Sequence, residues 1–368
     1  MRRPRLIVLQ PTPYCNIRCS YCYLGNRDDR RLMTKAVIEA VREKIFAGLD
    51  ADASPTVVWH AGEPTTAPIS WYEHAYERLR DVTPSATRFA MQSNGIAIND
   101  NWINLFRRTS TSVSLSIDGP RCFHDLRRRT RNDMPTWQLA VAALHRLQDA
   151  GFDPNVICVL HPEGLTSPDA YYEFCRDHSI TQISFSIDEL EGANRGCSFF
   201  ARDYKQDMTD FLVSILERAY VEGYPLHVRE VERIATILTG STPSQNEQIE
   251  PWDTIVIAAD GSVSTFSPEL MEVSTGYQGF KFGNILEGGF QDFDAMPLLK
   301  RVAREIKSGV ESCRSGCRYF AVCGGGAPVN KISENDRLES TETVFCRLSI
   351  QSAADALASF LNSRERRA

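Results

Sequence analysis

Strand-like and helix-like segments alternate six times in the first two-thirds of the chain, and this alternation limits the fold more than any other feature. Each strand-like run is short and apolar, and a longer run with helical periodicity follows it. The pairs comprise residues 5–12 and 34–49, 56–64 and 69–82, 88–95 and 99–109, 112–119 and 136–151, 155–161 and 169–179, and 182–190 and 203–223. Strands this apolar are typical of a parallel sheet buried on both faces. The pattern predicts an α/β fold with a parallel, curved sheet.

The alternation stops near residue 225. Residues 228–240 have a helical pattern, and the polar run 241–248 predicts a linker. Two strand-like runs within 253–266 are joined by Asp260–Gly261, which is a strong hairpin signal. A last helical pattern covers residues 349–367. We therefore expect three parts: a barrel domain at 1–225, a helical linker at 226–250 and a second domain at 251–368 that ends in a helix.

Composition and charge exclude several classes of function. The 368 residues carry a net charge of −6, so there is no basic footprint for nucleic acid. No apolar run approaches the roughly 20 residues needed to cross a bilayer. The N-terminal apolar run lacks a small-residue cleavage site, so we interpret it as a strand rather than a signal peptide. Eleven cysteines without a secretion signal favour metal binding over a disulfide framework. We expect a cytoplasmic protein.

Three of these cysteines, Cys15, Cys19 and Cys22, lie close together directly after the first predicted strand. Three thiolates are one short of closing a tetrahedral zinc site or a [4Fe–4S] cluster. A zinc knuckle needs a fourth ligand nearby, but the next cysteine is Cys122 and the nearest histidine is His60. A cluster held by three cysteines keeps one iron open to a ligand. The spacing therefore favours a catalytic cluster over zinc.

The CX3CX2C spacing, with Tyr21 before the third cysteine, resembles the signature of the radical S-adenosylmethionine (SAM) enzymes. The resemblance implies a partial (β/α)6 barrel, on which chemistry gathers at the carboxyl ends of the strands. It implies that the amino and carboxylate groups of SAM chelate the open iron. It also implies that an electron from the cluster cleaves SAM to a 5′-deoxyadenosyl radical. Related enzymes pack the adenine of SAM where Tyr21 lies in this chain.

The run HAGEPT (60–65) closes the second predicted strand and matches the family's Gly-Gly-Glu-Pro motif at Gly62, Glu63 and Pro64. That motif binds the SAM amino group, and a carboxylate suits a cationic amine. Ala61 replaces the first glycine and is small enough to keep the backbone close to a ligand. Taken alone, the run also fits a Gly-Pro loop with a solvated glutamate.

Further polar residues lie at or just beyond the ends of the third and fourth predicted strands. The resemblance implies SAM contacts from Ser93, Asn94, Ser114, Ser116 and Asp118, and a SAM-carboxylate contact from Arg128. Asn-Gly and Asp-Gly pairs are also ordinary turn chemistry, so each of these residues has a structural alternative. The neighbours Arg127, Arg129 and Arg131 equally fit a solvated basic face.

Four more cysteines lie near the C-terminus, at Cys313, Cys317, Cys323 and Cys346. Four thiolates close either a zinc site or a cluster. The run resembles the SPASM extension of radical SAM peptide maturases, which usually has seven cysteines and two auxiliary [4Fe–4S] clusters. Ser267, Gly288 and Ala327 stand where that resemblance expects the other three. The missing three are the family's ligands for the inner auxiliary cluster, so we predict one auxiliary cluster and two clusters in total.

Among SPASM enzymes, the cysteine loop, the 60–65 run and residues 265–270 most resemble cyclophane-forming maturases of the GrrM/OscB type. This implies a ribosomally made precursor peptide as substrate. A Cβ hydrogen is abstracted, the carbon radical attacks an aromatic ring two residues away, and an electron and a proton leave. The reaction requires an external electron donor. Glu269 and Asp118 are the candidate proton acceptors. Since 14 residues precede Cys15, we expect no leader-binding domain ahead of the barrel.

Two other classes of function remain open. One is a maturase of the sulfatase-activating or thioether-forming kind, which generally relies on the inner cluster that is missing here, or of the epimerising kind. The other is a non-catalytic iron–sulfur protein that transfers electrons. The open three-cysteine site and the strand-end motifs argue against the second class.

Overall fold

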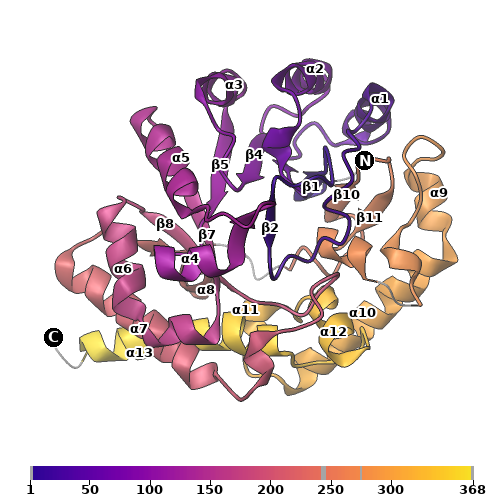
Figure 1. Ribbon diagram of the computed structural model, residues 1–368. Coiled ribbons are helices and arrows are strands. Elements are labelled where there is room, and N and C mark those ends of the chain that lie inside the picture. Colours follow the sequence, from indigo (N-terminus) through magenta and orange to yellow (C-terminus); the bar gives the residue numbers. More distant parts are fainter. Residues whose placement is uncertain (1–2, 242–245, 274–275, 366–368) are drawn as a thin grey trace.

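The computed structural model describes residues 3–241, 246–273 and 276–365, and its centre is a curved sheet with helices along the outer face (Figure 1). The strand order is β11 (Val263–Thr265), β10 (Thr254–Ile257), β1 (Leu6–Leu9), β3 (Thr56–Trp59), β4 (Arg88–Ser93), β5 (Thr111–Ser116), β7 (Asn155–Leu160), β8 (Gln182–Ile187) and β9 (His227–Val228). Neighbouring strands are parallel except β10 and β11. The predicted α/β partial-barrel fold is confirmed.

A helix follows each of the six predicted strands. These helices are α1 (Lys35–Lys44), α2 (Ile69–Arg80), α3 (Asp100–Thr109), α5 (Trp137–Asp149), α6 (Pro168–Asp177) and α7 (Lys205–Glu222). Local capping helps to set their ends: the Thr34 side chain accepts from the first turn of α1, and Asn99 does the same for α3. The observed strands end earlier than predicted, because the motif residues after them turn out of the sheet.

The core lies between the sheet and these helices. Trp59 of β3 is fully buried, packs edge-on against Tyr72 and donates its indole N–H to the Tyr76 hydroxyl at 2.8 Å. Both tyrosines belong to α2, so this contact fixes the helix against the strand that leads into residues 60–65. This packing therefore fixes the position at which residues 60–65 leave the sheet.

Three short elements were missed by the sequence patterns. Strand β2 (Ile17–Cys19) pairs antiparallel with β6 (Arg128–Thr130), and helix α4 (Arg121–Arg127) precedes β6. Three-residue strands are too short for alternation to predict. Their pairing sets Cys19 opposite Arg128 and so ties the cysteine loop to a segment more than a hundred residues away.

The sheet continues beyond the expected linker. Helix α8 (Arg229–Leu238) lies in that region, and residues 242–245 of the linker lie outside the described residues. Strand β10 then pairs in parallel with β1 and forms the predicted hairpin with β11. The first and last parts of the chain thus share one sheet, and the proposed division into domains stays a prediction.

The C-terminal part is mainly helical and lies along the right and lower edges of Figure 1. It contains α9 (Phe290–Ala295), α10 (Pro297–Gly316), α11 (Phe320–Cys323), α12 (Pro328–Asn335), a π-helical segment (Cys346–Gln351) and α13 (Ser352–Glu365). Short 3₁₀ turns occur at 46–48, 64–66, 162–166, 198–200, 268–272 and 278–280. Helix α13 packs on α7, where Lys205 forms an ion pair with Asp355 at 2.8 Å. Throughout the described ranges, no helix has the length and apolar character needed to span a membrane.

Candidate functional site

The loop with the first three cysteines is held by arginines from outside it and within it. Arg131 donates to the Cys15 carbonyl at 2.7 Å, and Arg27 donates to the Cys19 carbonyl at 2.8 Å. Cys15 and Cys19 are buried, and Cys22 is half-buried. These contacts hold the loop in shape and place positive charge near the thiols. Arg131 therefore supports the loop, rather than only forming the solvated face that was one of its two interpretations.

Glu63 ties together the ends of β3 and β4. Its buried carboxylate accepts from the Thr65 amide and hydroxyl at 3.0 and 2.5 Å, from the Ser93 hydroxyl at 2.7 Å and from the Asn94 amide at 2.7 Å. Burial nevertheless raises the pKa of Glu63, because desolvation outweighs these donors. Asn94 in turn reaches the Cys15 sulfur at 3.9 Å. One carboxylate thus positions a second strand end and, through it, a cysteine.

The turn before Glu63 is left-handed at two residues, Ala61 with φ of 70° and Gly62 with φ of 56°. A Cβ on Gly62 would lie 2.5 Å from the carbonyl oxygens of Thr12 and Tyr14, so only glycine fits there. Ala61 therefore adopts a left-handed conformation that glycine takes without strain, at a cost of about 1 kcal/mol. An alanine at the motif's first glycine position is thus compatible with this turn.

Arg128, Tyr21 and Asp118 form a buried chain. Arg128 donates to the Tyr21 hydroxyl at 2.6 Å, and that hydroxyl donates to Asp118 at 2.6 Å. The Val159 amide donates to the other Asp118 oxygen at 3.2 Å, and Arg128 lies 3.6 Å from that oxygen. Both carboxylate oxygens of Asp118 are therefore occupied by protein groups. This arrangement orients Tyr21 and Arg128.

A cavity of about 270 Å³ joins most of the predicted residues. Its lining includes Cys15, Cys19, Cys22, Tyr21, Gly62, Glu63, Ser93, Asn94, Ser116, Arg128 and Glu269. Pro64, Ser114 and Asp118 are not in the lining: Pro64 begins the 3₁₀ turn, Ser114 is half-buried within β5, and Asp118 holds Arg128. The strand-end motifs thus converge on the cysteine loop, as expected for parallel strands.

Three buried polar atoms on the cavity lining have no protein hydrogen-bond partner within the described ranges. They are the Tyr23 hydroxyl, His60 Nδ1 and Arg128 Nε. Buried polar atoms are rarely left unpaired, so these atoms indicate that a polar ligand completes the cavity. Three cysteines, a carboxylate and a guanidinium suit an open cluster with an amino-acid ligand bound to it.

Part of the cavity lining is acidic, and we call it the acidic wall. Glu189, Glu191 and Glu269 line the same cavity, and burial raises the pKa of each. Nearby carboxylates raise the pKa of Glu189 further, to about 8, although Asn330 donates to it at 2.6 Å. None of the three forms an ion pair with a described Lys, Arg or His. The wall can therefore hold protons near neutral pH.

Sequence reasoning missed several cavity residues. Gln92 donates to the Ser116 hydroxyl at 2.7 Å, and burial lowers the pKa of His60 to about 4, which keeps it neutral. Glu189 follows β8 closely, and its strand-end position was a usable signal. Glu191 and Tyr23 lie in loops, where no periodic pattern marks them.

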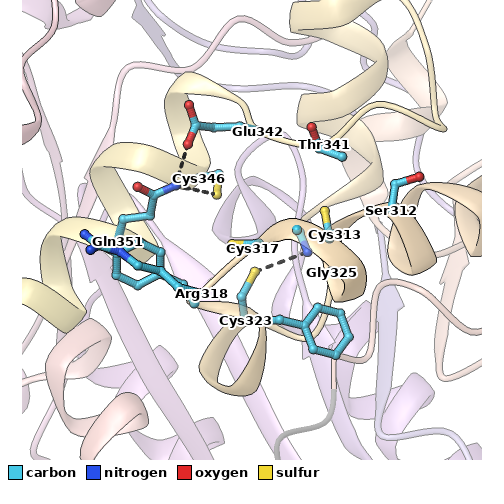
Figure 2. A pocket seen from close by; sticks show the side chains of 14 residues that line it. Ser312, Cys313, Cys317, Arg318, Cys323, Gly325, Thr341, Glu342, Cys346 and Gln351 are labelled. Carbon is cyan, nitrogen blue, oxygen red and sulfur yellow. Dashed lines mark hydrogen bonds between the residues drawn. The ribbon is translucent and has the colours of Figure 1, made fainter.

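The four C-terminal cysteines line a second cavity of about 380 Å³ (Figure 2). Cys313 and Cys317 lie at the end of α10, Cys323 ends α11 and Cys346 begins the π-helical segment. The Gly326 amide donates to the Cys323 sulfur at 3.2 Å, and Gln351 donates to the Cys346 sulfur at 3.6 Å. N–H groups aimed at sulfurs are typical of cysteines that ligate a metal centre.

Four cysteines around one cavity suit either a [4Fe–4S] cluster or a zinc ion, because four thiolates close both kinds of site. The residues expected to replace the inner-cluster cysteines are Ser267 and Ala327, both buried, and Gly288, in the turn before α9.

The curved sheet and its open three-cysteine cavity define a barrel enzyme built around a cluster that binds a ligand. Residues 9–175 match the family model of the radical SAM superfamily. The chain is also 33% identical over 360 residues to sll1766, an uncharacterised protein of Synechocystis sp., covering 96% of this chain and 90% of that protein. The chain belongs to the radical SAM superfamily, and a [4Fe–4S] cluster and SAM are its cofactors.

More distant similarities extend over the C-terminal part. A cysteine-type anaerobic sulfatase-maturating enzyme of Clostridium perfringens is 23% identical over 350 residues, which is 90% of each chain. The structure of anSMEcpe with bound AdoMet and the Cp18Cys peptide has a TM-score of 0.77, at 20% identity over 98% of each chain. Streptococcus suis SuiB bound to precursor peptide SuiA has a TM-score of 0.64, at 17% identity over 93% of this chain and 76% of that one. These structures share the fold.

Proposed function

We propose that this enzyme modifies a ribosomally made precursor peptide by joining an aromatic ring to the Cβ of a nearby residue, as in the GrrM/OscB-type maturases that the sequence resembles. The observation that carries this proposal is the first cavity, in which three cysteines share a lining with four glutamates, none of which forms an ion pair among the described residues. The similarity to SuiB, which was solved with a precursor peptide, supports a peptide substrate.

Different residues around the first cavity suit different parts of SAM. The cluster and SAM, when bound, supply a 5′-deoxyadenosyl radical for hydrogen abstraction. Glu63 suits the SAM amino group, and the Arg128 guanidinium suits its carboxylate, because each offers the opposite charge. Tyr21 borders the same space and fits the adenine. The arginine contacts to the cysteine loop keep these groups in place.

The peptide undergoes a balanced two-electron oxidation. It loses one Cβ hydrogen atom, gains a carbon–carbon bond to the ring, and then releases one proton and one electron as the ring regains aromaticity. Glu269 is the proposed proton acceptor, since it lines the cavity and its pKa is raised by burial. Asp118 is the weaker alternative because its oxygens are already occupied by Tyr21 and Val159.

The released electron needs an acceptor, and we assign this role to an auxiliary [4Fe–4S] cluster held by the four C-terminal cysteines. A separate protein then serves as electron donor for SAM cleavage. Anaerobically reconstituted enzyme should contain about 8 iron per chain, because each cluster holds about four. About 12 iron, or about 4 iron with one zinc, contradicts this count.

Mass spectrometry tests the peptide product. The substrate to test is a peptide encoded by a short open reading frame beside the enzyme gene in which an aromatic residue is followed two positions later by a polar one, and its product should be lighter by two hydrogens. Its tandem spectrum should lack backbone cleavage between the ring residue and its partner, since a cross-link holds both fragments together. An unchanged mass favours epimerisation. The Cys22→Ala variant is the matched control and should leave the peptide unmodified.

Sulfatase maturation is the second candidate. The similarity to cysteine-type anaerobic sulfatase-maturating enzymes over 90% of the chain favours it. A modified peptide whose backbone still fragments between every pair of residues points to this activity. Release of 5′-deoxyadenosine with SAM and reductant separates both candidates from a protein that only transfers electrons.

A further inference from the structure

Lys331 is a buried cation whose described partner is a sulfur. It lies on α12, is 2% exposed, and its Nζ lies 3.7 Å from Cys313 Sγ. Within the described residues, no Asp or Glu forms an ion pair with it. Burying an ammonium group is costly unless a negative charge compensates it. The contact with Cys313 therefore places the ammonium group where thiolate charge at the second cysteine site would stabilise it.

Two glycines make room for this side chain. A Cβ on Gly309 would lie 3.0 Å from Lys331 Nζ, and a Cβ on Gly326 would lie 3.3 Å from Lys331 Cε. Gly309 and Cys313 are one turn apart on α10, so the ammonium group lies over that turn and against the sulfur. Because neither glycine has a side chain, there is room for the aliphatic part of Lys331, and its ammonium group contacts Cys313.

The other sulfur contacts at this site involve neutral donors. Cys323 accepts from the Gly326 amide, and Cys346 accepts from the Gln351 amide. Arg318 also borders the cavity, but it donates to the Tyr319 hydroxyl. Among the described contacts, Lys331 is the charged group that donates to a cysteine sulfur.

We propose that Lys331 is a positioning residue that raises the reduction potential of the auxiliary cluster through its N–H···S contact with Cys313. This inference rests on the proposed second cluster. Reduction adds one electron and one negative charge to the cluster, and no atom is transferred. A nearby ammonium group stabilises the more negative state, as hydrogen bonds and charge near cluster sulfurs do in general.

Helix α12 also contacts the first cavity. Asn330, next to Lys331, donates to Glu189 in the first cavity at 2.6 Å. Adjacent residues of one helix thus contact the cavity proposed for the peptide and the site proposed to accept its electron. A raised potential makes that transfer more favourable.

The test is a redox titration of the reconstituted holoenzyme, followed by electron paramagnetic resonance. Lys331→Met keeps the apolar stem and removes the charge, so its reduction equilibrium constant should fall about tenfold, equivalent to about 59 mV for one electron. Lys331→Arg retains the charge and should stay close to wild type. Lys205→Met is the matched control, because Lys205 contacts Tyr319 of the same loop but no sulfur in the described contacts. The midpoint of the SAM-binding cluster should not move in any variant.

Three results overturn the inference. An unchanged midpoint in Lys331→Met with about 8 iron shows that the ammonium group does not tune the cluster, and leaves the proposed function intact. Loss of about four iron from both Lys331→Met and Lys331→Gln shows that the lysine holds the site together instead. About 4 iron in the wild type removes the second cluster and the inference with it.

Discussion

The two cysteine sites differ in how the chain builds them. Cys15, Cys19 and Cys22 come from one short loop, and the nearby Arg27, the distant Arg131 and the strand-end residue Asn94 fix its shape. The other four cysteines come from the end of α10, from α11 and from the π-helical segment. Three thiols leave a coordination position for a ligand, whereas four close a cluster. One site is therefore suited to chemistry on a ligand and the other to electron transfer.

The largest effect expected from the difference between the two sites is a loss of SAM cleavage at the first site. Replacing Cys19 with alanine removes one of three ligands, so about half of the iron should be lost and SAM cleavage should fall by on the order of 10³-fold or more. Iron analysis and chromatography of 5′-deoxyadenosine measure both effects. Cys158→Ala is the control, since Cys158 is buried in β7 and lines neither cysteine cavity. Normal SAM cleavage by Cys19→Ala contradicts the assignment of the open cluster.

The second site should separate the two roles. Cys317→Ser removes a ligand of the proposed auxiliary cluster but no contact of the first cavity. SAM cleavage should stay within about threefold of wild type, whereas cross-linked peptide should fall by about 10²-fold, because the released electron lacks its acceptor. The ratio of cross-linked peptide to 5′-deoxyadenosine is the measurement. A ratio equal to that of wild type shows that the second site does not accept the electron.

The two sites also differ in how far the sequence predicts them. The cysteine spacings and the residues after β3, β4 and β5 are local patterns, and parallel strands necessarily bring their ends together. The contact of Arg131 with Cys15 and the pairing of Cys19 with Arg128 join residues far apart in the sequence, so no local pattern contains them. Lys331 lies eight positions after Cys323 and looks like an ordinary helix residue until α10 packs beside it.

Helix α10 shows a signal that could have been used. Leu299, Val302, Ile306, Val310 and Cys313 recur at helical spacing and are all buried. That apolar stripe predicts a helix leading into the cysteines. The carboxyl wall of the first cavity, by contrast, depends on segments after β8 and β11, which meet only in the folded barrel.

Within the first site, Glu63 should affect SAM affinity more than cluster content. Glu63→Gln keeps the shape and removes the negative charge proposed to meet the SAM amino group, so the Kd for SAM should rise about 10- to 100-fold. Iron content should remain near wild type. Equilibrium binding of SAM to the reconstituted enzyme provides the value, and Glu43→Gln on the exposed face of α1 is the control. An unchanged Kd limits Glu63 to its contacts with Ser93 and Asn94.

The smallest expected effect is on stability, and it arises from the acidic wall that the second site lacks. Burial and neighbouring carboxylates raise the pKa of Glu189 to about 8, above the value near 4.3 in an unfolded chain. Between these values the folded state binds more protons at Glu189 than the unfolded state. The stability that this group contributes is therefore greatest below the unfolded pKa and falls as pH rises toward 8. The Tm of the holoenzyme should therefore drop by about 2 °C between pH 6 and pH 8. Glu189→Gln cannot ionise and should lose most of that drop, whereas the exposed Glu77→Gln on α2 should retain it. If the Tm of the two variants depends on pH equally, Glu189 is ionised throughout this range. The first site then lacks the protonated carboxyl group that is expected to set it apart from the second site.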